Sequence, residues 1–183
     1  MSILAEIIKH KKMEIAALDA ESLRAAAEAT PTPRDFRATL IGDEQRQVRL
    51  IAELKRASPS KGMLAPHLDL LQVADIYAQN GASAISVLTD ETFFLGRLDT
   101  LRGLRFERRV ELPLLRKDFI IDEVQLYESR VSGADAVLLI AAALTDDKHF
   151  ADMHALALEL GLTPLVEVHD EAETERALRL KDI

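Results

Sequence analysis

The stretch Leu50-Ile-Ala-Glu-Leu-Lys-Arg-Ala-Ser-Pro-Ser-Lys-Gly62 changes within a few residues from an apolar strand to a charged loop that contains a proline. Side chains along a strand alternate between its two faces, so Glu53 and Lys55 share one face at the carboxyl end of the predicted strand. Enzymes of the α/β class place their catalytic groups at that end. A salt bridge that only stabilises the strand end explains the same spacing equally well. The residues at the ends of the other predicted strands are needed to choose between these two interpretations.

Strands and helices are predicted to alternate from Val48 onward. The strands are expected at 48–54, 83–88, 112–116, 135–140 and 163–168. Each is followed by a helix, expected at 68–80, 98–107, 122–132, 146–160 and 170–180. The strand Ala136-Val-Leu-Leu-Ile140 is apolar on both faces, which is typical of a parallel sheet covered by helices. This pattern leaves two α/β architectures open, a doubly wound sheet and a (β/α)8 barrel.

Three glycines mark the ends of predicted helices. Gly81, Gly133 and Gly161 each stand where a helix gives way to a strand, the position at which a residue of left-handed conformation commonly ends a helix. Their intervals fit a repeating unit of about 26 to 28 residues. The repeat therefore supports five strand–helix units.

The first 46 residues precede this repeat and are predicted to be helical. One helix is expected over residues 2–28, ending at Thr30-Pro-Thr-Pro33 because a proline disfavours helix at the residue before it. A short second helix is expected over Arg34 to Leu40, before a turn at Gly42-Asp43. We therefore divide the chain into a helical extension, 1–46, and an α/β part, 47–183.

Composition excludes several classes of function. The 183 residues are 48% apolar and 30% charged, as in a globular protein with one sizeable core. A formal charge of −8 argues against a nucleic-acid surface, which needs concentrated Lys and Arg. The absence of cysteine excludes disulfides and thiolate chemistry and fits a reducing cytoplasm. No apolar run approaches the roughly 20 residues that span a bilayer, and no targeting segment is evident.

Two further strands end in charged residues. Lys117 follows Leu114-Leu115-Arg116 and has the parity of Leu115, and Glu167 follows Pro164-Leu165-Val166 and has the parity of Leu165. Together with Glu53 and Lys55 they would bring two lysines and two carboxylates to one rim of the sheet. A surface salt bridge does not require this repetition. The pattern indicates general acid–base catalysis on a phosphorylated or carboxylated substrate.

The residues around these positions resemble the indole-3-glycerol phosphate synthase family. The stretch Ile51-Ala-Glu-Leu-Lys-Arg-Ala-Ser-Pro-Ser-Lys-Gly62 resembles the signature of that family. Four more stretches are similar to it: Ala84-Ile-Ser-Val-Leu-Thr-Asp-Glu-Thr-Phe-Phe-Leu-Gly96, Pro113-Leu-Leu-Arg-Lys-Asp-Phe-Ile-Ile-Asp122, Gly133-Ala-Asp-Ala-Val-Leu-Leu-Ile140 and Pro164-Leu-Val-Glu-Val168. The likeness extends over essentially the whole chain, including the helical extension. Arg97 departs from it, because the family commonly has a small polar residue there.

The resemblance implies a (β/α)8 TIM barrel and a reaction that needs neither metal nor organic cofactor. The substrate would be 1-(2-carboxyphenylamino)-1-deoxyribulose 5-phosphate, which undergoes ring closure, loss of carbon dioxide and loss of water to give indole-3-glycerol phosphate in tryptophan biosynthesis. By similarity, Lys117 would be the general acid of ring closure and Glu167 the general base of dehydration. Lys55 would engage the substrate's carboxylate or phosphate and could exchange the acid role with Lys117, and Glu53 would orient the lysines.

The resemblance also implies substrate contacts. Phe94, Phe119 and Leu138 match apolar contacts to the anthranilate ring, although an ordinary place in the core explains a single Phe or Leu as well. Ser58 would donate a hydrogen bond to the substrate. The histidines show no metal-ligand spacing and are interpreted as structural or surface residues: His10, His67, His149, His154 and His169.

Length leads to a further expectation. A complete barrel has eight units in about 250 residues, whereas five units are predicted here. The family's later strands carry an asparagine, a serine and the phosphate-binding loops, so the 183 residues alone are expected to be inactive. One alternative is a non-catalytic partial barrel that self-associates through its open edges. Another is a different phosphate-binding barrel enzyme, such as a relative of phosphoribosylanthranilate isomerase, which would not explain the joint set of motifs.

Overall fold

A computed structural model describes residues 2–41, 48–58, 62–63 and 67–183. These residues form two compact units, and each is described by itself. Unit 1 comprises Met1–Thr32, Phe119–Val131 and Val137–Ile183, and unit 2 comprises Pro33–Asp118 and Ser132–Ala136. Within the described residues, no helix is both long enough and apolar enough to cross a membrane.

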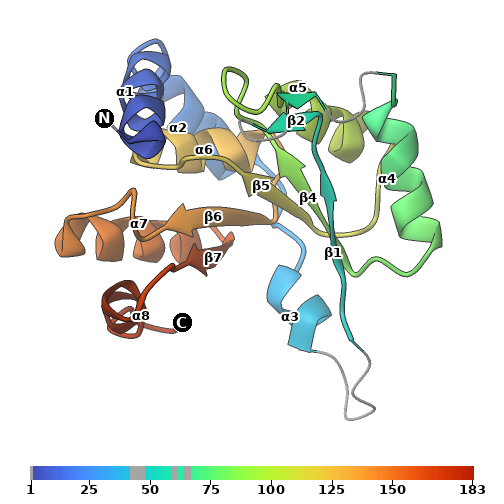
Figure 1. The fold of residues 1–183 in the computed structure, drawn as a ribbon. Coiled ribbons are helices and arrows are strands. Elements are labelled where there is room, and N and C mark those ends of the chain that lie inside the picture. The colour runs from blue at the N-terminus through green and yellow to red at the C-terminus, as the bar shows by residue number, and fades with distance from the viewer. Residues whose placement is uncertain (1, 42–47, 59–61, 64–66) are drawn as a thin grey trace. The chain divides into compact units, whose positions relative to one another are not determined.

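Unit 2 is built on parallel strands. Its sheet strands are β1 (Ile51–Leu54), β4 (Ala84–Leu88) and β5 (Leu114–Lys117), and its helices are α3 (Phe36–Ile41), α4 (Leu70–Gln79), α5 (Leu98–Arg102) and the π-helix η1 (Gly103–Glu107). Strand β4 lies between β1 and β5 and is parallel to both (Figure 1). Every residue of β4 is buried, as the predicted covering of the sheet by helices requires.

Asp135 anchors the core of unit 2. Its carboxylate is almost completely buried and accepts hydrogen bonds from the backbone N–H groups of Arg34 (2.7 Å) and Leu114 (2.8 Å). It also forms a salt bridge with Arg105. A buried carboxylate is stable only when its oxygens are paired in this way. Asp135 therefore fixes the start of β5 and, with it, the position of Lys117.

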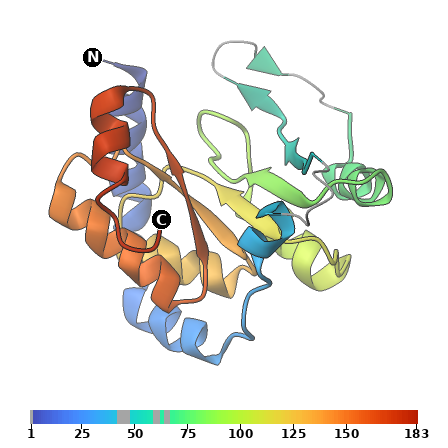
Figure 2. The same ribbon diagram turned by 90° about the horizontal axis from the view of Figure 1, so that it is seen from below.

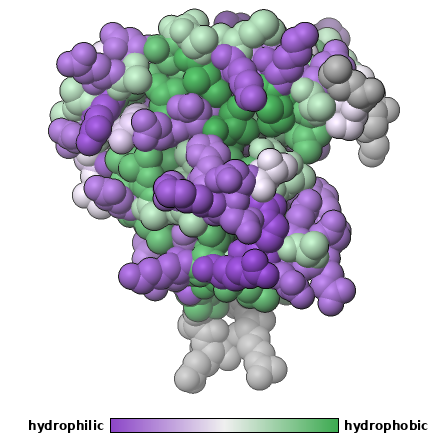
Figure 3. Space-filling model, turned by 90° about the vertical axis from the view of Figure 1, so that its left-hand side faces the viewer, coloured by the Kyte–Doolittle hydropathy of each residue, from purple (hydrophilic) through white to green (hydrophobic). Residues whose placement is uncertain are grey.

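Unit 1 is mainly helical. Its helices are α1 (Ile3–Ile15), α2 (Ala20–Ala29), α6 (Glu123–Val131), α7 (Asp147–Glu159) and α8 (Glu171–Ala177), and its strands are β6 (Ala136–Ile140) and β7 (Thr163–Glu167). Helix α2 packs against α6 (Figure 2). The buried guanidinium of Arg130 in α6 donates to the carbonyl oxygens of Thr30 and Leu160, each at 2.9 Å, and so ties α6 to the ends of α2 and α7. Hydrophilic and hydrophobic residues are interspersed on the face shown in Figure 3.

The predicted alternation of strands and helices is confirmed for all five strand–helix units within the described residues. The three glycines predicted to end helices adopt positive φ: Gly81 (86°), Gly133 (85°) and Gly161 (74°). At Gly133 a side chain is also excluded, because a Cβ atom there would lie 2.5 Å from Arg105 Cγ.

The prediction of a single helix over residues 2–28 is wrong. Helix α1 ends at Ile15 and α2 begins at Ala20. Asp19 causes the break, because its side chain accepts a hydrogen bond from the backbone N–H of Ser22 (3.1 Å) and caps the new helix. The expected turn at Gly42-Asp43 lies outside the described residues.

Two local features were not predicted. The loop after β1 contains a short antiparallel pair, β2 (Ala57–Ser58) and β3 (Gly62–Met63). The helix expected over 98–107 is an α-helix for its first half and a π-helix for its second. Both features depend on local backbone hydrogen bonds that hydrophobic periodicity does not encode.

Candidate active site

Glu53 lies between two lysines in unit 2. Its Oε1 atom is 2.5 Å from Lys55 Nζ, and its Oε2 atom is 3.1 Å from Lys117 Nζ. All three side chains are partly exposed, so substrate and solvent can reach them. The structure therefore brings together three of the four predicted acid–base residues and confirms that Glu53 and Lys55 share a face.

The strand register explains how Glu53 reaches Lys117 across β4. Glu53 is paired with Ser86 of β4, and Ser86 is paired with Leu115 of β5. Side chains of paired residues lie on the same face, so Ser86 stands between the strands that carry Glu53 and Lys117. Its side chain is small and buried, and its Oγ has no hydrogen-bond partner among the described residues. A small residue here leaves room for the contact.

Electrostatics keep Glu53 ionised. Partial burial acts to raise its pKa, but the hydrogen bonds and positive charges of Lys55 and Lys117 outweigh burial, so the pKa of Glu53 is lowered. Glu53 is thus a carboxylate at neutral pH. It balances the charge of two neighbouring ammonium groups, which would otherwise repel each other.

A buried network supports β5 from its other face. Arg116 and Asp118 flank Lys117 in sequence and are almost completely buried. An Arg116 guanidinium nitrogen lies 3.1 Å from Asp118 Oδ2, and the hydroxyl of Thr89 donates to the same oxygen at 2.7 Å. Arg116 Nε also donates to Thr89 Oγ1 at 3.2 Å. Because alternate residues lie on opposite faces, this network holds the strand while Lys117 remains accessible.

The loop after β4 is held close to the strand end. Asp90 Oδ1 accepts hydrogen bonds from the backbone N–H groups of Phe93 (2.7 Å) and Phe94 (3.1 Å). Gly96 approaches the strand so closely that a Cβ atom would lie 2.4 Å from the Leu88 carbonyl oxygen. Phe94, a predicted substrate contact, is half-buried on this loop. A cavity of about 580 Å³ lies beside it and is lined by Arg56, Met63, Glu91, Leu95, Gly96 and Arg97.

Other predicted site residues lie in unit 1 or have no described side chain. Glu167 ends β7, and its side chain is 36% exposed. Phe119 is half-buried, whereas Leu138 in β6 is only 4% exposed, as expected of a core residue. The backbone of Ser58 lies in β2, and its side chain falls outside the described atoms.

The sequence analysis missed a partner of Glu167. His169, interpreted as a structural or surface residue, places its Nε2 atom 3.2 Å from Glu167 Oε1. The spacing Glu167-Val-His169 repeats that of Glu53-Leu-Lys55, so the same alternation rule would have found it. Within the residues that the structure describes, no group of three or more His, Asp or Glu side chains is arranged to hold a metal ion.

The fold and these residues define a class first: an α/β enzyme with acid–base groups at the carboxyl ends of its strands. The sequence model of the family described as indole-3-glycerol phosphate synthase matches residues 4–182. The chain therefore belongs to the indole-3-glycerol phosphate synthase family, whose members are (β/α)8 barrels and carboxy-lyases of tryptophan biosynthesis.

Individual relatives support the same family assignment. Indole-3-glycerol phosphate synthase from a Roseiflexus species is 51% identical to the chain, with the match covering 97% of this chain and 68% of the relative. The enzyme of the same name from Chlorobium chlorochromatii is 46% identical over 98% of this chain and 70% of the relative. The chain thus spans about two thirds of the length of these relatives. A crystal structure of N-succinyl Arg/Lys racemase from Bacillus cereus resembles the fold, with a TM-score of 0.53, 9% identity and coverage of 73% of this chain and 34% of that one.

Proposed function

We propose that the chain carries the acid–base groups with which indole-3-glycerol phosphate synthase converts 1-(2-carboxyphenylamino)-1-deoxyribulose 5-phosphate to indole-3-glycerol phosphate. The observation that carries this proposal is the contact of Glu53 with both Lys55 and Lys117. An isolated structural salt bridge needs one lysine. A second lysine, on β5 across the intervening strand β4, supplies a proton donor beside the group that would hold an anionic substrate.

Lys117 is proposed as the general acid of ring closure. Its ammonium group is a hydrogen-bond donor that can give a proton to the departing substrate oxygen. Glu53 orients that ammonium group through their 3.1 Å contact. Lys55, at the other oxygen of Glu53, is proposed to engage the substrate's carboxylate or phosphate and to share the acid role.

Glu167 is proposed as the general base of the dehydration that completes the indole. It ends its strand as Lys117 ends β5, and its carboxylate is accessible. Phe94 and Phe119 are proposed to contact the anthranilate ring, since each is half-buried and carries a large apolar ring. Leu138 and Ser58 stay as predicted contacts of the same substrate.

Replacing Lys117 by alanine tests this function. The assay uses an eight-unit form, in which the chain is continued by the C-terminal part of the Roseiflexus relative. Loss of the general acid is expected to lower kcat by about 10² to 10⁴ without unfolding the protein. Lys148→Ala, which removes a lysine that is 83% exposed in α7, is the matched control and is expected to keep full activity. Near-normal turnover by Lys117→Ala would overturn the assigned role.

Several broader features are part of the same proposal. We place the enzyme in the cytoplasm, where tryptophan biosynthesis takes place in its family, and give residues 1–46 the role of a helical extension before the barrel. We further propose that the 183 residues by themselves are inactive or nearly so. Neither nucleic acid nor membrane is proposed as a partner, and open sheet edges favour self-association.

A further inference from the structure

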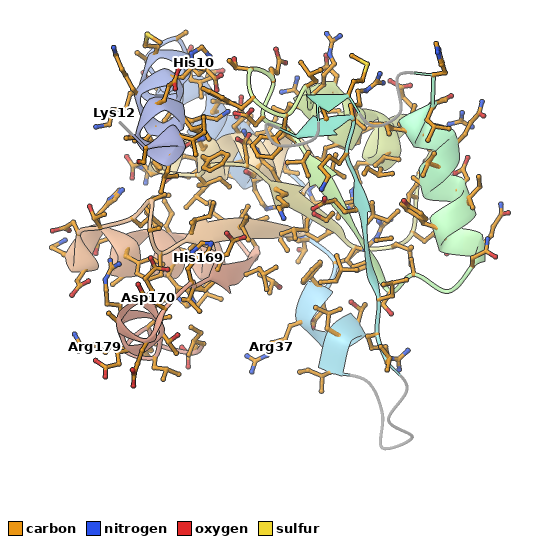
Figure 4. The ribbon with its side chains drawn as sticks, in the orientation of Figure 1. His10, Lys12, Arg37, His169, Asp170 and Arg179 are labelled. Atoms are coloured by element: carbon orange, nitrogen blue, oxygen red, sulfur yellow. The ribbon has the colours of Figure 1, made fainter. Side chains whose placement is uncertain are left out.

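His169 lies in the short segment between β7 and α8 of unit 1. Figure 4 labels it next to Asp170, the residue that caps α8. Its imidazole is 57% exposed, so burial does not explain its orientation. The contacts of its two ring nitrogens do.

The imidazole is held between two carboxylates. Its Nε2 atom is 3.2 Å from Glu167 Oε1, and its Nδ1 atom is 3.3 Å from Glu173 Oε2. The backbone N–H of His169 donates to the same oxygen of Glu173 at 2.8 Å. Two hydrogen bonds from one residue to one carboxylate oxygen fix the histidine relative to α8.

Glu173 is itself held in place. Its backbone N–H donates to Asp170 Oδ1 at 2.8 Å, and its side chain is only 16% exposed. The contacts therefore run from the first turn of α8 through Glu173 and His169 to Glu167 at the end of β7. Asp170 is the further carboxylate beside this group, and its Oδ1 oxygen is used by the helix cap.

The contacts define how many N–H groups the ring has to donate. A carboxylate oxygen only accepts hydrogen bonds, and a neutral imidazole has one N–H to donate. A ring that donates to both Glu167 and Glu173 therefore carries a proton on each nitrogen. Such charge-assisted hydrogen bonds are about twice as strong as neutral ones.

We infer that His169 is a positioning residue for Glu167: its imidazole, braced by Glu173, holds the Glu167 carboxylate in one orientation at the carboxyl end of β7. A general base needs a fixed orientation, because it must accept a proton along a defined direction. This inference rests on the proposed role of Glu167 for its catalytic consequence. The geometry of the three side chains does not depend on that role.

Nuclear magnetic resonance on the chain itself tests the geometry. Ring N–H protons of an exposed histidine exchange rapidly with water, whereas hydrogen-bonded ones persist at low temperature in mildly acidic buffer. Both ring N–H signals of His169 are expected to be visible. Glu167→Gln should broaden the Nε2 signal more than the Nδ1 signal, and Glu173→Gln should do the reverse. Absence of both signals in the unaltered chain would overturn the inference.

Two substitutions test the catalytic consequence in the eight-unit form. His169→Gln keeps an N–H donor near the position of Nε2, which faces Glu167, whereas His169→Asn keeps one near the position of Nδ1, which faces Glu173. We expect His169→Asn to lower kcat by roughly tenfold with little change in KM, which is smaller than the effect of losing the general base itself. We expect His169→Gln to retain most activity. Equal activity of the two variants would overturn the positioning role.

Failure of the proposed role of Glu167 and failure of the inference about His169 give different results. If Glu167→Gln leaves turnover near normal, the proposed base is wrong, and the resonance experiment still decides whether His169 bridges the two carboxylates. If Glu167→Gln abolishes turnover but the ring signals are absent, the function stands and the inference about His169 is wrong.

Discussion

Glu53 shows how one side chain can carry both a structural and a chemical role. Its two oxygens contact different lysines, and its lowered pKa follows from those contacts. At the residue scale, the site depends on this carboxylate remaining charged, because a neutral glutamic acid accepts fewer hydrogen bonds and no longer balances the two ammonium groups.

The lowered pKa of Glu53 predicts how stability depends on pH. A group whose pKa is lowered on folding adds stability above its unfolded pKa, about 4.3 for glutamate, and this stability is lost as pH falls through the folded value. Between about pH 4.3 and the lower folded pKa, the free energy of unfolding should therefore fall more steeply in the unaltered chain than in Glu53→Gln. Denaturant titrations across this range measure the difference. Parallel curves would show that the lysines do not stabilise the charged form.

His154 provides a second pH-dependent residue, in unit 1. Burial lowers its pKa, and the charge of Asp182 opposes this effect only in part. A histidine with a lowered pKa gives full stability above its unfolded pKa of about 6.5 and less as pH falls below that value. We expect His154→Gln to flatten this loss between about pH 6.5 and 5, whereas the exposed His149→Gln leaves it unchanged. Thermal unfolding at several pH values is the measurement, and an unchanged slope in His154→Gln would contradict the assignment.

At the scale of elements, caps and register determine what the hydrophobic pattern leaves open. The strands, the alternating helices and the glycines at helix ends follow from period and composition. The break between α1 and α2 does not, because a high-propensity alanine-rich sequence masks the cap at Asp19. The signal was present in Asp19 itself, a residue type that favours the capping position.

Removing this cap should destabilise unit 1. Asp19→Ala leaves an N–H group of the first turn of α2 without its partner, which typically costs about 1 kcal/mol. Glu21→Ala, an exposed change in the first turn of the same helix, is the control. Equilibrium unfolding in urea measures the change in the free energy of unfolding for both variants. A loss for Asp19→Ala no larger than that for Glu21→Ala would mean that the cap contributes nothing.

Part of the candidate site could be predicted, because side chains alternate between the two faces of a strand. The alternation of side chains along a strand correctly predicts that Glu53 and Lys55 share a face, and the parity of Lys117 with Leu115 predicts a further charged group at the end of β5. The contact of His169 with Glu167 is not predicted, because the absence of metal-ligand spacing says nothing about a single histidine that pairs with a carboxylate. The bracing by Glu173 comes from the first turn of a helix and depends on three-dimensional closure that periodicity does not describe.

At the scale of the whole molecule, five strand–helix units of an eight-unit family raise the question of what the 183 residues do alone. Large hydrophobic side chains are exposed near the end of unit 1: Val168, Leu178 and Ile183. The chain spans 68% and 70% of the lengths of the two relatives, so it holds only part of the polypeptide that forms a barrel in its family.

The isolated chain is therefore predicted to be inactive and to self-associate. Purified chain should show no turnover at ordinary enzyme rates, and sedimentation should give a mass above the 20.3 kDa of one chain. The eight-unit form serves as the reference for activity. Ordinary turnover by the 183 residues alone would contradict the first expectation, and a strictly monomeric chain would contradict the second.

Ser86 has a consequence for how this site can vary in evolution. Its side chain stands between the strand positions of Glu53 and Lys117, so its size limits how closely side chains of β1 and β5 can approach each other. Substitution by glycine or alanine preserves the gap, whereas leucine or phenylalanine would fill it and separate the ion pair without altering either charged residue. Selection on the charged pair is thus also selection on the volume of an uncharged neighbour, and only small residues should be tolerated at position 86.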